Sequence, residues 1–109
     1  SSSIARRGAL NSSAYAATKG GVLGLMRALA LAPARAGIRA NAISPGIADT
    51  PMPRQVMSET DLFERGEDIP LGRIGTPIDM VEAAMFLLSK DASFVTGQDI
   101  RVNGGAGLF

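Results

Sequence analysis

The feature that most constrains the fold is a long run without proline, from residue 14 to residue 32. The run is rich in Ala, Leu and Gly and ends at Pro33, which cannot continue a helix. It predicts a helix about 30 Å long. The apolar stretch inside it is interrupted by Arg27 and is rich in alanine, so it is too short to span a bilayer comfortably.

Two strand-like segments and a second helix follow this run. Residues 38–43 alternate like a short buried strand and lead directly into Pro45-Gly46. Residues 77–90 predict a helix with Thr76 as N-cap and Pro77 at its first position, and residues 97–102 predict a final strand. A Pro-Gly turn at a strand end exposes backbone groups at the carboxyl edge of a sheet, where ligands of open α/β folds bind.

Tyr15 and Lys19 lie four residues apart near the start of the first predicted helix. Side chains at this spacing share one helix face, so the lysine charge can act on the tyrosine hydroxyl. A neighbouring cation favours the ionised form of a phenol, which makes the pair a candidate proton shuttle. The alternative is structural, with Tyr15 in the core and the Lys19 ammonium reaching solvent.

Serines cluster upstream of this pair, at Ser1, Ser2 and Ser3. A hydroxyl from this cluster can point at the same place as the Tyr15 phenol. The alternative is that these serines only form a turn or a cap.

These motifs occur in one order that resembles the short-chain dehydrogenase/reductase family. The resemblance extends over essentially all 109 residues and is strongest to the branch of 3-oxoacyl carrier-protein reductases and glucose dehydrogenases. Its remaining motifs are Pro70-Leu71-Gly72-Arg73-Ile74-Gly75-Thr76-Pro77, Phe94-Val95-Thr96-Gly97-Gln98-Asp99-Ile100 and Val102-Asn103-Gly104-Gly105.

The resemblance implies an α/β fold, the C-terminal portion of a Rossmann-like doubly wound parallel sheet with three α/β/α layers. Residues 1–109 would form the C-terminal part of a single domain. A complete family enzyme is about twice as long or more, and its first half carries the glycine-rich dinucleotide turn. Neither Gly-x3-Gly-x-Gly nor Asn-Asn-Ala-Gly occurs in this sequence.

The family's reaction is the NAD- or NADP-dependent interconversion of a carbonyl and a secondary alcohol by hydride transfer. By resemblance, Tyr15 is the general acid or base, and Lys19 assists it and hydrogen-bonds the nicotinamide ribose. A serine polarises the substrate carbonyl. Spacing from the tyrosine favours Ser2, whereas local sequence favours Ser3, and both remain candidates.

The Pro-Gly turn carries the nicotinamide-contacting loop in the family. Cofactor contacts are therefore expected from Tyr15 and Lys19 and from Pro45, Gly46, Ile47 and Thr50, with Ile47 offering backbone groups to the carboxamide. The alternative is an ordinary turn with a helix cap at Thr50. Residues 52–68 resemble the mobile substrate-binding lid of the family.

Partners follow from the resemblance and from the composition. The family implies a small-molecule carbonyl or alcohol substrate, a cytoplasmic location, and a dimer or tetramer in which the helix of residues 14–32 packs against its copy; the alternative is burial of that helix within one subunit. A formal net charge of +1 gives no argument for nucleic acid or membrane. Cysteine and histidine are absent, and no metal site is expected.

The short length predicts further properties. We expect a C-terminal fragment that is inactive in isolation, because the pyrophosphate contacts are missing. Its central strands would have an open apolar edge, so the isolated chain is expected to be unstable or to oligomerise. The alternatives to a catalytic half are an inactive remnant that acts as an oligomerisation piece and an unrelated binding module.

Overall fold

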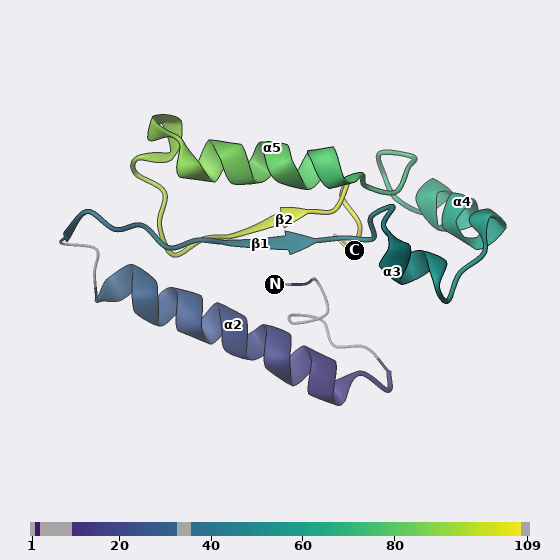
Figure 1. The fold of residues 1–109 in the computed structure, drawn as a ribbon, viewed down its shortest axis with the longest axis horizontal. Helices are drawn as coiled ribbons and strands as arrows, with labels where there is room; N and C mark the ends of the chain where they lie inside the picture. The colour runs from purple at the N-terminus through teal and green to yellow at the C-terminus, as the bar shows by residue number, and fades with distance from the viewer. Residues whose placement is uncertain (1, 3–9, 33–35, 108–109) are drawn as a thin grey trace.

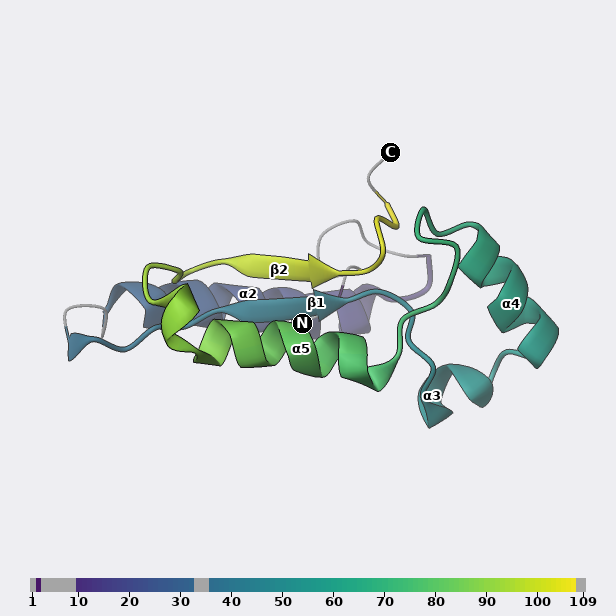
Figure 2. The ribbon, with the colours of Figure 1, turned by 90° about the horizontal axis from the view of Figure 1, so that it is seen from above.

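The computed structural model describes residues 2, 10–32 and 36–107 and has three layers (Figure 1). Helix α2 covers one face of a parallel sheet and helix α5 covers the other, while α3 and α4 lie beyond the carboxyl ends of the strands (Figures 1 and 2). This arrangement confirms the predicted α/β class. The elements in chain order are α2 (Ser13–Leu31), β1 (Ala42–Pro45), α3 (Pro51–Arg54), α4 (Glu59–Glu67), α5 (Pro77–Leu88), the 3-10 turn η2 (Lys90–Ala92) and β2 (Asp99–Val102).

Within the described residues, the sheet consists of β1 and β2, which pair in parallel from Ala42↔Asp99 to Pro45↔Val102. Both strands are shorter than predicted, since residues 38–41 and 97–98 lie outside them. The reason is that the Asn41 side chain makes hydrogen bonds where a longer strand would pair through its backbone. The Asn41 amide donates to the Val95 carbonyl at 2.8 Å and its oxygen accepts from the Gln98 N–H at 3.0 Å.

Helix α2 matches the predicted helix to within one residue at each end. Leu23 and Met26 are buried and pack against Ala42 of β1. Ala30 lies one turn further along the same face, close to Gly97. The small apolar residues of the run therefore allow this helix to approach the sheet closely.

Helix α5 begins where the sequence predicts, with Thr76 at the N-cap and Pro77 at the first position. The Asp79 carboxylate accepts from the Thr76 N–H at 2.7 Å and hydroxyl at 2.9 Å, and it pairs with Arg73 at 2.8 Å. Hydrogen bonds from Arg73, and then from Thr76, hold the pKa of Asp79 below its usual range. The helix ends two residues before the predicted end, because Ser89 leaves helical geometry and its hydroxyl donates to the Phe86 carbonyl.

Replacing Asp79 with asparagine is expected to destabilise α5. Because the pKa of Asp79 is lower in the folded chain, its contribution is complete above the unfolded value of about 3.9 and is lost as the pH falls through the folded value. At neutral pH the variant should melt several degrees lower, roughly 4–8 °C for one lost cap in a domain of this size. The difference in melting temperature between the Asp79→Asn variant and the unmodified chain should become smaller as the pH falls below about 4.

Thermal unfolding followed by circular dichroism at a series of pH values measures this effect. Asp68→Asn is the matched control, because Asp68 is exposed at the C-terminal end of α4, and it should change the melting temperature little. A difference between Asp79→Asn and the unmodified chain that stays constant down to strongly acidic pH would contradict the assigned role of the carboxylate.

Large apolar side chains are exposed on both helical layers. On α2 they are Val22, Leu25, Leu29 and Leu31. On α5 they are Ile78, Val81, Met85, Phe86 and Leu88. The predicted oligomer and the predicted instability of the isolated chain remain predictions. None of the described helices has the length and hydropathy needed to cross a bilayer.

Candidate functional site

The first turns of α2 and the carboxyl ends of β1 and β2 lie toward the same end of the molecule (Figures 1 and 2). The helix runs antiparallel to the strands beneath the sheet, so its N-terminal turns are at the strand ends. The fold thus places the Tyr15 and Lys19 segment at the same end of the sheet as the Pro-Gly turn.

Tyr15 and Lys19 meet on one face of α2. The Lys19 Nζ atom lies 5.4 Å from the centroid of the Tyr15 ring, within reach of a cation–π interaction. Lys19 precedes Leu23 and Met26 at helical spacing, so it continues the stripe that faces the sheet and is half-buried. Tyr15 is 41% exposed in this chain, and the choice between a catalytic and a structural role remains a prediction.

The structure describes only one of the two candidate serines. Ser2 is described and half-buried. Ser3 lies outside the described residues, together with residues 1 and 4–9. The choice between the two serines therefore remains a prediction.

The turn after β1 is packed tightly against the end of β2. Gly46 donates its N–H to the Val102 carbonyl at 3.0 Å, which continues the ladder past Pro45. A Cβ atom on Gly46 would lie 2.8 Å from the Cβ and 2.9 Å from the Cα of Asn103. Asn103 is itself fixed, because its amide donates to the Ala106 carbonyl and its oxygen accepts from the Gly105 N–H. Only glycine fits at position 46 in this arrangement.

Beyond Gly46, the chain pairs with a second segment. The Gly75 N–H donates to the Ile47 carbonyl at 2.9 Å, and the Asp49 N–H donates to the Gly75 carbonyl at 2.8 Å. These bonds form an isolated parallel bridge between Ala48 and Gly75. Of the backbone groups of Ile47, the carbonyl is thus already engaged within the chain.

Thr50 occupies the N-cap position of α3, followed by Pro51 at the first helical position. Its side chain makes no capping hydrogen bond. The alternative of a helix cap at Thr50 is therefore correct in position only, and the hydroxyl is not used to cap the helix.

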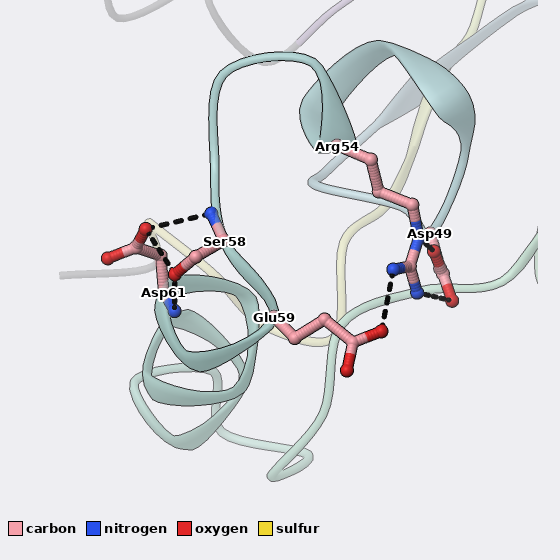
Figure 3. A network of polar contacts seen from close by, with 5 residues as sticks. All are labelled: Asp49, Arg54, Ser58, Glu59 and Asp61. Carbon is pink, nitrogen blue, oxygen red and sulfur yellow. Dashed lines mark hydrogen bonds and ion pairs between the residues drawn. The ribbon is translucent and has the colours of Figure 1, made fainter.

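A polar network that the sequence analysis did not identify follows this turn (Figure 3). The Arg54 guanidinium donates to both carboxylate oxygens of Asp49, at 2.6 and 3.0 Å, and to Glu59 at 3.1 Å. The hydrogen bond from Arg54 lowers the pKa of Asp49, and the two carboxylates raise the pKa of Arg54. No local pattern in the sequence indicates this triad, because its members come from a loop and two helices.

The first turn of α4 is closed by a capping box between Ser58 and Asp61. The Ser58 hydroxyl accepts from the Asp61 N–H at 3.1 Å, and the Asp61 carboxylate accepts from the Ser58 N–H at 2.9 Å. The Ser58 hydroxyl and N–H also lower the pKa of Asp61. The Ser-x-x-Asp spacing was a readable indication of this helix start.

A pocket of about 610 Å³ is lined by residues of the predicted lid region and by the segment of residues 72–74. Neither Tyr15 nor Lys19 lines it. Its lining residues are Arg54, Glu59, Thr60, Leu62, Phe63, Gly66, Gly72, Arg73 and Ile74. Among the described residues, no group of carboxylates is arranged to hold a metal ion.

Comparison with known proteins gives consistent results. The family model described as enoyl-(acyl carrier protein) reductase matches residues 1–107. The 3-oxoacyl-[acyl-carrier-protein] reductase FabG of Chlamydia muridarum is 40% identical over 96% of this chain and 42% of that protein. The acetoacetyl-CoA reductase of Synechocystis is 44% identical over 95% of this chain and 43% of that protein.

Two solved structures are similar to the fold. The glucose/ribitol dehydrogenase of Brucella melitensis, described as a short-chain dehydrogenase/reductase, matches with a TM-score of 0.86 at 43% sequence identity. The match covers 96% of this chain and 42% of the Brucella chain. The ligand-free aldohexose dehydrogenase of Thermoplasma acidophilum matches with a TM-score of 0.90 at 36% sequence identity. The match covers 100% of this chain and 46% of the Thermoplasma chain.

The chain spans less than half the length of the curated relatives it matches. Both the family model and the relatives nevertheless cover nearly all of its residues, and the three-layer arrangement agrees with the solved structures. The chain belongs to the short-chain dehydrogenase/reductase family of oxidoreductases.

Proposed function

We propose that this chain supplies the acid/base part of an NAD- or NADP-dependent enzyme that interconverts a carbonyl and a secondary alcohol. The observation that carries the proposal is the exposed Tyr15 phenol beside the Lys19 ammonium, at the end of α2 nearest the strand ends. Ligands of open α/β sheets bind at this edge. The relatives named above are reductases and dehydrogenases, which supports the same chemistry.

A bound nicotinamide supplies or accepts the hydride. In the reductive direction, the Tyr15 hydroxyl donates a proton to the carbonyl oxygen, and in the oxidative direction its phenolate takes the proton from the alcohol. Lys19 assists Tyr15 in this transfer and, with a cofactor bound, would donate to the nicotinamide ribose. Ser2 or Ser3 donates a hydrogen bond to the same carbonyl oxygen.

The turn after β1 fits the nicotinamide end of the cofactor. Because the Ile47 carbonyl accepts from Gly75, the Ile47 N–H is the backbone group assigned to the carboxamide. Thr50 contributes its hydroxyl, which is not used to cap α3. Pro45 and Gly46 shape the turn, and no residue of this chain is assigned to the adenosine and pyrophosphate.

The finer properties are part of the same proposal. The relatives named above are a 3-oxoacyl-[acyl-carrier-protein] reductase, an acetoacetyl-CoA reductase and an aldohexose dehydrogenase. We propose a substrate with a carbonyl or secondary alcohol without choosing among these classes. A cytoplasmic homodimer or homotetramer is the proposed form of the complete protein, with residues 1–109 as the C-terminal part of one domain.

A second candidate function is that of an inactive oligomerisation piece. The observation in its favour is the exposed apolar stripe on α2, formed by Val22, Leu25 and Leu29 at helical spacing. Such a stripe suits packing against a second helix. The two functions differ in whether Tyr15 and Lys19 contribute to turnover.

A hybrid protein tests the proposed function. The part of the Chlamydia muridarum reductase that matches this chain, 42% of its length, is replaced by residues 1–109. We expect the hybrid to oxidise NADPH or NADH with acetoacetyl-CoA as substrate, because the grafted Tyr15 and Lys19 complete the site. Loss of the Lys19 charge in Lys19→Met should reduce turnover by about 10²-fold or more.

Lys90→Met is the matched control, because Lys90 begins the 3-10 turn η2, which follows α5. This control should keep the activity of the unmodified hybrid. A soluble hybrid that binds the cofactor but has no turnover would refute the catalytic assignment and favour the oligomerisation piece.

A further inference from the structure

One side chain, Arg54, joins the turn after β1 to helix α4 (Figure 3). It belongs to the last turn of α3, and it reaches back to Asp49 and forward to Glu59. Asp49 lies directly before the Thr50 N-cap. A single guanidinium thus connects the proposed cofactor turn to the first turn of α4, within the predicted lid.

The two connections differ in strength. Arg54 binds Asp49 through two hydrogen bonds, at 2.6 and 3.0 Å, in the bidentate geometry that favours arginine–carboxylate pairs. It binds Glu59 through one hydrogen bond at 3.1 Å, and the Glu59 side chain is 88% exposed compared with 40% for Asp49. A single exposed ion pair contributes little and is screened by salt, so the Glu59 bond is the weaker of the two.

Helix α4 is also held at its other end. Leu62 is buried, and Gly66 packs so closely on the following segment that a Cβ atom would lie 3.2 Å from the Ile74 nitrogen. The capping box between Ser58 and Asp61 closes the first turn with side-chain hydrogen bonds. The helix is therefore a stable unit, fixed by packing near Gly66 and by an ion pair at Glu59.

The pocket of about 610 Å³ lies between these two attachments. Arg54 and Glu59 line it together with Leu62 and Phe63 of α4 and with Gly72, Arg73 and Ile74. Release of Glu59 would let the first turn of α4 move relative to its attachment at Gly66. The width of the pocket would change with that movement.

We propose that Arg54 is a positioning residue that acts as a latch, fixed at Asp49 and releasable at Glu59, and that it sets the position of α4 relative to the turn of residues 47–50. The latch follows from contacts of the described residues alone. It does not depend on the proposed reaction, and its failure and the failure of the proposed function are distinguishable.

Amide hydrogen exchange of the 109-residue chain tests the latch. In Glu59→Gln, exchange in the first turn of α4 should rise about two- to fivefold, as expected for one exposed ion pair, while residues 47–50 keep their exchange rates. In Arg54→Met, exchange should rise in both segments, because both bonds are lost. Arg54→Lys keeps the charge without the bidentate geometry, so it should restore part of the protection in α4.

Salt separates a latch from a purely structural contact. At about 1 M salt, where the screening length is about 3 Å, the α4 exchange of the unmodified chain should rise to that of Glu59→Gln, which should itself change little. Arg27→Lys is the matched control, because Arg27 is an exposed arginine of α2 that takes no part in the Arg54 contacts. It should leave exchange in α4 unchanged.

Three results would overturn the proposal. They are unchanged α4 exchange in Glu59→Gln and Arg54→Met, an equal rise throughout the chain in either variant, and α4 amides of the unmodified chain that exchange as fast as unstructured peptide. Exchange rates require no cofactor or substrate, so each result is informative whether or not the hybrid enzyme shows turnover.

Discussion

Replacing Tyr15 with phenylalanine should abolish turnover of the hybrid reductase while leaving cofactor affinity nearly intact. Phenylalanine keeps the ring over which the Lys19 ammonium lies, at 5.4 Å from its centroid, and removes only the hydroxyl. General acid/base catalysis by a positioned side chain is worth about 10²- to 10⁴-fold in rate, and a loss of this size is expected. Steady-state oxidation of NADPH or NADH gives turnover, and cofactor fluorescence gives affinity.

Thr18→Val is the matched control for this experiment. It removes a neighbouring hydroxyl on the same helix, one that donates to the Tyr15 carbonyl at 2.8 Å. The Thr18→Val variant should retain most of the activity, because the hydroxyl that it removes is bonded only to the helix backbone within the described part of the chain. Since Tyr15 is the only tyrosine of the chain, turnover retained in Tyr15→Phe would rule out a phenol of this chain as the acid or base.

The second large effect is expected from Gly46→Ala. The new Cβ atom would lie 2.8 and 2.9 Å from two Asn103 atoms, one of them in the backbone. Asn103 cannot yield easily, because its side chain is bonded to Ala106 and Gly105. Overpacking of this kind costs about 1–3 kcal/mol, and the free energy of unfolding measured in urea should fall by that amount.

Gly24→Ala in α2 is the matched control, because a Cβ atom at Gly24 meets nothing within 4 Å. Glycine inside a helix costs roughly 0.5–1 kcal/mol relative to alanine, so this variant should be slightly more stable. Replacing glycine with alanine is thus expected to lower the free energy of unfolding at position 46 and to raise it at position 24. Equal stability of the two variants would contradict the close approach of Gly46 to Asn103.

The two longest helices could be predicted well because their limits are local, whereas α3 and α4 fall in a segment that was predicted only as a lid. A proline-free run defines α2, and Thr76-Pro77 defines the start of α5. The end of α5 was predicted too late, because Ser89 is bonded to Phe86 by its own side chain. The strands were predicted too long, because the Asn41 side chain takes bonds that a strand backbone would make.

Within the candidate site, the proximity of Tyr15 and Lys19 was predictable in the same way. Tyr15 and Lys19 are neighbours within one helical turn, so their spacing in the sequence was enough to place them together. The Arg54 latch was not predictable, because it depends on how α3 folds against the turn before it and on where α4 begins. Its bonds are tertiary, although each spans only five residues of the chain.

The pairing of β1 with β2 also has a consequence for the order of folding during synthesis. Ala42 pairs with Asp99, and the same separation of 57 residues joins Asn41 to Gln98. At a synthesis rate of about 5–20 residues per second, β1 waits roughly 3 to 11 s before its partner has been made. During that interval α5 can form from local contacts, whereas the pairing of β1 with β2 cannot, so on the ribosome α5 precedes the strand pair that it covers.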